Sequence, residues 1–168
     1  MLAEKYSGEI KTILGRYPAD QTRSAVMALL YLAQKEYGAI TRDVLTEVGA
    51  LAGLDPTQVA GLIGFYSLFS DRPQGARRVQ ICTDLPCALR GAENFAADLC
   101  ANLGVKLGET TSDGEFTVEA VTCLAGCDKA PLFQVQDRDG AHYHESESAE
   151  QPMTVDRAME ILRGYKKK

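Results

Sequence analysis

The sequence has few of the features that mark a nucleic-acid-binding, membrane-spanning or exported protein. Its net charge of −5 argues against a nucleic-acid partner, because phosphate binding needs a basic face. The only run of basic residues, 166–168, closes the sequence and is expected to be a solvated tail. The longest strongly apolar run, 25–33, is too short to span a bilayer. The first residues contain no apolar signal core. We therefore expect a cytoplasmic protein without direct contact with lipid.

Three absent motifs narrow the possible functions further. No G-x-G-x-x-G fingerprint occurs, so the chain is not expected to bind a dinucleotide by itself. No C-x-x-C occurs, which argues against a pair of redox-active thiols. The C-x₄-C-x₂-C run of plant-type ferredoxins is absent as well. The chain alone therefore shows no complete active site.

Residues 1–72 are predicted to form a helical bundle. Apolar residues recur there at helical spacing, and Tyr17-Pro18, Gly38 and Gly53 separate the segments. Asp55 followed by Pro56 is a strong helix start. Helices are expected at 2–16, 21–37, 42–52 and from Pro56 onward. Gly61 and Gly64 lie inside the last helix, which favours close packing against a neighbouring helix.

Residues 73–168 show a different pattern, after a polar linker at 70–77. Short apolar segments and turn residues predict strands, and longer 3.6-residue periodicities predict helices. Strands are expected at 78–82, 105–110, 115–121, 132–136 and 141–144, and helices at 89–103 and after Thr154. The fold class is therefore α+β or α/β, with a mixed sheet that follows the helical bundle.

Four of the five cysteines form two close pairs within this second part. Four residues separate Cys82 from Cys87, and three separate Cys123 from Cys127. Both pairs follow predicted strands, which places them on loops that a rigid sheet carries. A [2Fe-2S] cluster takes four thiolates, two on each iron. Two short-spaced pairs meet that requirement, and the four cysteines are the candidate ligands of one such cluster.

Other uses of these cysteines remain open on spacing alone. A structural zinc ion also takes four thiolates, and it would make the chain a zinc-stabilised interaction module. Disulfides or redox thiols are a further alternative, although paired cysteines in a reducing compartment are more often metal ligands.

The remaining cysteine and the two histidines have structural interpretations. Cys100 lies on the apolar face of the helix predicted at 89–103, where a free cysteine is usually a buried core residue. His142 and His144 alternate along a predicted strand and share one face. We expect them to be exposed strand residues and not metal ligands.

The motifs CTDLPCALRGAE and CLAGCDKAPLFQV, with upstream segments such as VAGLIGFYSLFSDRPQGARRVQICTD, resemble a known family. It is the thioredoxin-like [2Fe-2S] ferredoxin subunit of respiratory complex I, the E subunit of NADH-quinone oxidoreductase, and the resemblance covers nearly the whole chain. It implies a helical bundle followed by a thioredoxin-like domain. It also implies that Cys82 and Cys87 bind one iron, and Cys123 and Cys127 the other.

The same resemblance implies a cofactor arrangement and partners. The cluster would exchange single electrons with the FMN of a larger flavoprotein subunit that also binds NADH. Further iron-sulfur subunits would belong to the same complex, in the cytosolic peripheral arm of a membrane-associated oxidoreductase. Similar modules occur in NAD-dependent formate dehydrogenases and in soluble or electron-bifurcating hydrogenases, which remain alternatives.

Overall fold

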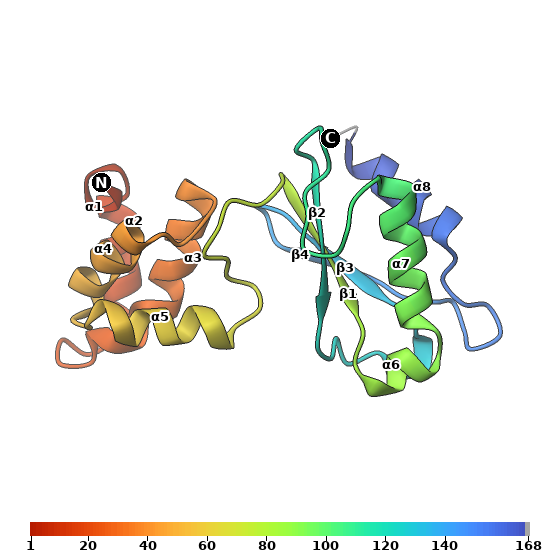
Figure 1. Cartoon of the computed structure of the whole chain (residues 1–168). Coiled ribbons are helices and arrows are strands. Elements are labelled where there is room, and N and C mark those ends of the chain that lie inside the picture. Colours follow the sequence, from red (N-terminus) through yellow and green to blue (C-terminus); the bar gives the residue numbers. More distant parts are fainter. Residues whose placement is uncertain (167–168) are drawn as a thin grey trace. The chain divides into compact units, whose positions relative to one another are not determined.

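A computed structural model describes residues 1–166. The chain divides into two compact units, Met1–Pro73 (unit 1) and Gln74–Lys168 (unit 2), and the elements of each are labelled in Figure 1. Lys167 and Lys168 of the expected basic tail lie outside the described residues. Lys166 is part of the last helix, and its Nζ lies 2.5 Å from Asp113 Oδ2.

Unit 1 is helical, as predicted. Its elements are α1 (Leu2–Lys5), α2 (Ser7–Leu14), the 3-10 helix η1 (Thr22–Ala25), α3 (Val26–Tyr37), α4 (Arg42–Ala52) and α5 (Pro56–Phe65). The expectation of a single helix at 2–16 is wrong. Two helices, α1 and α2, occupy this segment, because the backbone leaves helical geometry at Tyr6, with φ −118° and ψ 30°. The helix expected at 21–37 likewise begins as η1.

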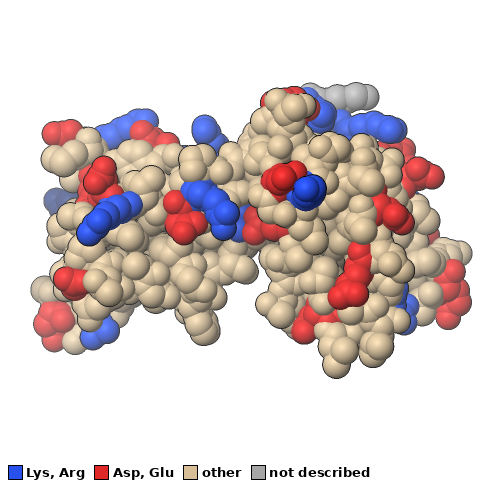
Figure 2. Space-filling view, viewed as in Figure 1, with Lys and Arg blue, Asp and Glu red and all other residues tan. Residues whose placement is uncertain are grey.

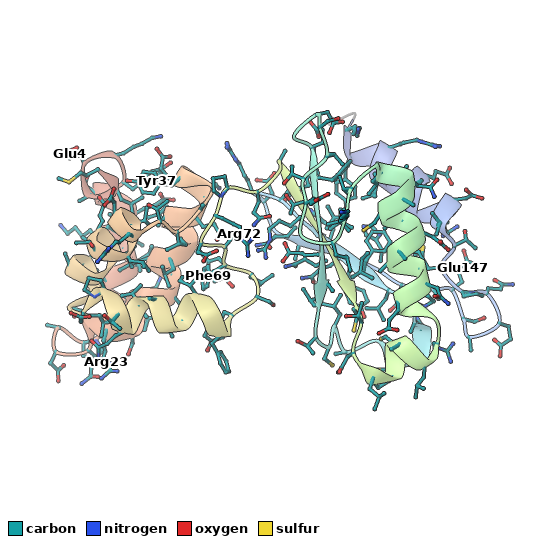
Figure 3. All side chains as sticks on the ribbon, viewed as in Figure 1. Glu4, Arg23, Tyr37, Phe69, Arg72 and Glu147 are labelled. Carbon is teal, nitrogen blue, oxygen red and sulfur yellow. The ribbon has the colours of Figure 1, made fainter. Side chains whose placement is uncertain are left out.

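The core of unit 1 is centred on α3. This helix is apolar over much of its circumference, and its buried side chains belong to one cluster that takes residues from every helical element of unit 1. Phe69, labelled in Figure 3, closes one side of the core and stacks at a tilt on Tyr31, with ring centroids 4.8 Å apart. The largest fully buried side chains of this core are Leu2, Leu29, Leu30, Ile40 and Val48.

Local capping explains where α4 and α5 meet. Gly53 ends α4 in the left-handed region, with φ 70°, a conformation that glycine adopts at little cost. Asp55 then caps α5: its carboxylate accepts a hydrogen bond from the Thr57 backbone N–H at 2.8 Å. Between residues 1 and 166 no single helix is long and apolar enough to cross a membrane, and α4 and α5 meet that criterion only as a pair bent by 112°.

The expectation that Gly61 and Gly64 pack closely against a neighbouring helix is wrong. Both glycines lie on the exposed side of α5. Among the described residues, nothing lies within 4 Å of a Cβ built at either position. Close helix packing inside unit 1 therefore does not account for them.

Unit 2 is a four-stranded mixed sheet with helices, in agreement with the predicted fold class. Its elements are β1 (Arg77–Cys82), α6 (Leu85–Leu89), α7 (Ala92–Leu103), β2 (Phe116–Val121), η2 (Cys127–Lys129), β3 (Phe133–Gln136), β4 (Ala141–His144) and α8 (Val155–Lys166). The strand order is β2-β1-β3-β4. β1 and β2 are parallel, whereas β3 is antiparallel to both β1 and β4.

One predicted strand is absent and one helix was not expected. Residues 105–110 form no strand, and only an isolated bridge joins Thr110 to Thr117. The short helix α6 precedes α7, and Gly91, with φ 85°, separates them. The hairpin of β3 and β4 and the helix after Thr154 are confirmed.

The two faces of the sheet differ in polarity. Both α7 and α8 lie on the same side of the sheet (Figure 1) and cover its apolar face. The sheet residues of this core are Val79, Ile81, Phe116, Val118, Phe133 and Val135. The opposite face carries buried polar pairs: Arg78 Nε lies 2.7 Å from Glu119 Oε1, and Gln134 Nε2 donates to Gln80 Oε1 at 2.6 Å. Alternation along β1 places Cys82 on this polar face.

Candidate metal centre

The two cysteine pairs start from neighbouring strand ends. Cys82 is the last residue of β1, and its register partner in β2 is Val121, two residues before Cys123. Because β1 and β2 are parallel, their carboxyl ends lie at the same edge of the sheet. The topology therefore brings together two loops that are about forty residues apart in the sequence.

The first loop continues into α6. Asp84 caps this helix, and its carboxylate accepts a hydrogen bond from the Leu85 backbone N–H at 3.0 Å. Cys87 faces inward from α6 and is fully buried. Leu85 and Leu89 face outward and are 69% and 80% exposed. Figure 2 shows mainly uncharged surface at this tip of unit 2.

The second loop has an unusual backbone. Cys123 and Ala125 both adopt the left-handed region, with φ 45° and 61°, which is uncommon for residues other than glycine. Cys127 then begins η2, and a cis peptide bond joins Ala130 to Pro131. Cys123 is exposed and Cys127 is partly buried.

Three of the four sulfurs belong to one small buried cluster, separate from the main core of unit 2. Cys82 and Cys87 are buried in it and Cys127 packs against it, together with apolar side chains that include Ala92 and Leu132. Burial, together with the nearby Cys82 and Cys127 sulfurs, raises the pKa of the Cys87 thiol to about 12. A thiolate here thus needs a compensating positive charge, which a bound metal supplies.

The donor set fits an iron-sulfur cluster. Two loops at one sheet edge offer four thiols and apolar walls, which are the ligands and the partial exclusion of solvent that such clusters use. Across residues 1–166, no three His, Cys, Asp or Glu side chains surround a point where one metal ion could be held. The cysteines lie as two loop-borne pairs, with Cys123 at the exposed rim.

The other candidate residues lie away from these loops. Cys100 is buried on α7 in the main core, as predicted. The side chain of His142 is half-exposed, and its Nε2 lies 3.6 Å from Asp137 Oδ2. The expectation that His144 is exposed is wrong: its Nε2 lies 3.0 Å from the Tyr165 hydroxyl, and burial lowers its pKa. His142 and His144 share one face of the sheet, as predicted, and Tyr165 of α8 packs against both rings there.

A family model described as thioredoxin-like [2Fe-2S] ferredoxin matches residues 10–166. The chain belongs to this family. Among curated relatives, the NADH-quinone oxidoreductase E 2 subunit of Rhizobium meliloti is 42% identical over 129 residues, which cover 77% of this chain and 76% of that protein. NADH-quinone oxidoreductase subunit 2 of Thermus thermophilus is 39% identical over 128 residues, which cover 76% of this chain and 71% of that protein.

A solved structure with the same fold is a chain of NAD⁺-reducing [NiFe]-hydrogenase in the H₂-reduced state. Its TM-score is 0.58 and its sequence identity 17%, and the match covers 83% of this ferredoxin but only 22% of the hydrogenase chain. At this identity the likeness concerns the fold alone.

Sequence reasoning missed two features of the cysteine loops: the helix α6, and the contact of Tyr143 with the second loop. The helix α6 is short, so it shows little periodicity of its own. Gly126 is visible in the sequence beside Cys127. The contact that favours a glycine at this position, however, comes from a distant part of the chain. That contact is made by Tyr143 on β4, whose hydroxyl hydrogen-bonds to the Leu124 carbonyl oxygen, and no local pattern connects residues so far apart.

Proposed function

We propose that this ferredoxin is the electron-transfer subunit of an NADH-quinone oxidoreductase, respiratory complex I. The observation that carries the proposal is the match to relatives from NADH-quinone oxidoreductase at 42% and 39% identity over about three quarters of the chain. The arrangement of four cysteines at one edge of the sheet supports it independently. The chain contributes to an oxidoreductase as one of its subunits and holds no complete active site of its own.

Within this proposal, Cys82 and Cys87 bind one iron, and Cys123 and Cys127 bind the other. The first pair is held by the end of β1 and by α6, and the second by the loop after β2. The cluster, when bound, accepts and returns one electron at a time. The apolar side chains around Cys87 limit the access of water, and the exposure of Cys123 places one ligand at the surface. This asymmetry favours electron exchange on the Cys123 side.

The proposed partner is the flavoprotein subunit that binds FMN and NADH. NADH releases two electrons as a hydride, whereas an iron-sulfur cluster carries them singly, so a flavin is the chemical link between them. The ferredoxin would lie with other iron-sulfur subunits in the peripheral, cytoplasmic arm of the complex. Unit 1 is proposed to contact the partner, because Phe65 and Tyr66 at the end of α5 are exposed aromatic residues.

The equivalent subunit of a hydrogenase or formate dehydrogenase is the alternative parent. The hydrogenase structures share the fold at 17% and 19% identity, well below the identity to the NADH-quinone oxidoreductase relatives. Complex I is therefore preferred. A reconstitution test separates the parents: the complex I flavoprotein should reduce this ferredoxin with NADH, observed as bleaching of its visible absorption.

The cluster itself is tested on the purified chain. We expect about two irons and two acid-labile sulfides per chain, and a [2Fe-2S] electron paramagnetic resonance (EPR) signal after reduction. Cys82→Ala and Cys127→Ala should each abolish the signal, since each removes a ligand. Cys100→Ala is the matched control and should retain full iron content, because Cys100 lies in the main core.

Two results would contradict the proposal. One zinc ion per chain in place of iron would favour the zinc-stabilised interaction module. Loss of the cluster in the Cys100→Ala variant, with the fold intact by circular dichroism, would show that the ligand set is wrong.

A further inference from the structure

Tyr143 reaches the cysteine loops from the edge strand β4. Its register partner is Gln134 on β3, which in turn pairs with Gln80 on β1. Residues in register share a face of the sheet. Tyr143 therefore lies on the polar face, together with Cys82, whereas His142 and His144 point to the opposite face.

The Tyr143 side chain lies across the Cys123–Cys127 loop. Its hydroxyl donates a hydrogen bond to the Leu124 carbonyl oxygen, with 3.1 Å between the two oxygens. A Cβ built on Gly126 would collide with the same hydroxyl oxygen and would lie 3.3 Å from Tyr143 Cζ. The ring thus occupies the space directly over Gly126, which explains the glycine at this position.

The loop needs such support. Cys123 and Ala125 hold left-handed backbone conformations, with φ 45° and 61°, and residues with a Cβ keep these conformations only where the surroundings impose them. Leu124, whose carbonyl oxygen accepts the tyrosine hydrogen bond, lies between these two residues. The contact therefore acts where the backbone is most strained.

We propose that Tyr143 is a positioning residue, which holds the Cys123–Cys127 loop in the conformation that binds the cluster through its hydrogen bond to Leu124 and its packing over Gly126. This inference rests on the proposed ligand roles of Cys123 and Cys127. Tyr143 acts through the backbone that carries the two thiolates.

The test uses the full chain with its cluster bound. Tyr143→Phe removes the hydroxyl and keeps the ring. We expect shifted or broadened EPR g-values for the reduced cluster, because the geometry of two ligands relaxes. We also expect cluster loss to a chelator to be about two- to tenfold faster, the range that corresponds to one hydrogen bond.

Tyr37→Phe is the matched control. Tyr37 is 42% exposed, as is Tyr143, and its hydroxyl also makes one hydrogen bond, to Glu47 at 2.9 Å. It lies in unit 1 (Figure 3), which contains none of the cluster ligands. Its substitution should leave the EPR spectrum and the rate of cluster loss unchanged.

A second-site experiment separates positioning from general stability. Gly126→Ala should lower iron content, because the new methyl group collides with the Tyr143 hydroxyl. Adding Tyr143→Phe to Gly126→Ala should restore part of the iron content, since it removes the atom that the methyl group meets. If Tyr143→Phe only destabilised the fold, the double variant would contain less iron than Gly126→Ala alone.

The outcomes are distinct. A Tyr143→Phe protein with the EPR spectrum and cluster-loss rate of the wild type would overturn the inference and leave the proposed function intact. A double variant with no more iron than Gly126→Ala would overturn it as well. A wild-type protein without a [2Fe-2S] signal would overturn the proposed function, and this inference with it.

Discussion

At the scale of single residues, Cys87 and Cys123 represent the two extremes among the proposed ligands. Cys87 is fully buried on the inner side of α6, whereas Cys123 is exposed at the start of its loop. Burial, with a contribution from the neighbouring Cys82 and Cys127 sulfurs, raises the pKa of the Cys87 thiol to about 12. In the folded chain without metal, the Cys87 thiol therefore stays protonated up to a pH well above the ordinary pKa of cysteine.

This difference predicts unequal reactivity in the chain stripped of metal. Alkylation requires an accessible thiolate. At about pH 8 Cys123 should react with iodoacetamide more than about tenfold faster than Cys87. Cys87 alkylation should accelerate as the pH rises toward its raised pKa. Mass spectrometry of tryptic peptides over a pH series measures both rates.

The cluster-loaded protein is the control for this reactivity. Both cysteines should be protected when iron is bound, because a ligated thiolate is no longer a free nucleophile. Equal alkylation rates of Cys87 and Cys123 in the metal-free chain would mean that the burial of Cys87 is not maintained in solution.

At the scale of secondary-structure elements, the glycines of α4 and α5 have opposite surroundings. Gly49 on α4 is buried where the chain turns back, and a Cβ there would lie 2.7 Å from the Leu54 carbonyl oxygen. Gly61 on α5 is exposed, and a Cβ there meets nothing within 4 Å among the described residues. Both glycines lie within helices, but only Gly61 has room for an added methyl group.

Alanine at these positions should therefore have opposite effects. Gly49→Ala should lower the free energy of unfolding by about 1–3 kcal/mol, because the backbone must shift to admit the methyl group. Gly61→Ala should raise it by up to about 1 kcal/mol, because alanine is the better helix former. Chemical denaturation followed by circular dichroism measures both changes.

The Gly61 result also bears on binding. If Gly61→Ala stabilises the isolated chain but weakens its assembly with the proposed flavoprotein partner, the exposed glycine face of α5 belongs to an interface. A stabilised chain that assembles normally would remove that explanation. Destabilisation by Gly61→Ala would contradict the open surroundings of this position.

At the scale of the whole molecule, the two units have separate cores. For residues 1–166, the buried apolar cluster of unit 1 shares no residue with the clusters of unit 2. The cysteines all lie in unit 2. A core defect in unit 1 should thus leave the cluster site intact.

Leu29→Ala tests this separation. Leu29 is fully buried on α3, and its truncation should destabilise unit 1 by about 2–5 kcal/mol. Hydrogen exchange measured by mass spectrometry should accelerate in peptides of unit 1 and remain unchanged in peptides from β1 and α7. The visible absorption of the cluster should also be unchanged. Loss of the cluster in this variant would show that the two units are energetically coupled.

Much of this protein could be predicted from local sequence. Helices α3, α4, α5 and α8 follow from apolar periodicity and from caps such as Asp55 and Gly53, because neighbouring residues determine both. The cysteine spacing indicated a four-thiolate centre, since a metal site selects its ligand types directly. The assignment of Cys100 to the core followed from its place on the apolar face of α7.

Other features depended on residues that are distant in the sequence. The parallel pairing of β1 and β2 placed the two cysteine loops at one edge, and the segment 105–110, which has a strand-like pattern, formed no strand. His144 became partly buried because α8 brings Tyr165 to it. A side chain at Gly126 would collide with Tyr143, which reaches the loop from β4. The sequence by itself predicted a four-thiolate centre and determined most helices, because both depend on short-range patterns of residue types. Only the tertiary structure decided how the cysteine loops are held, because backbone hydrogen bonds and packing between distant segments do so.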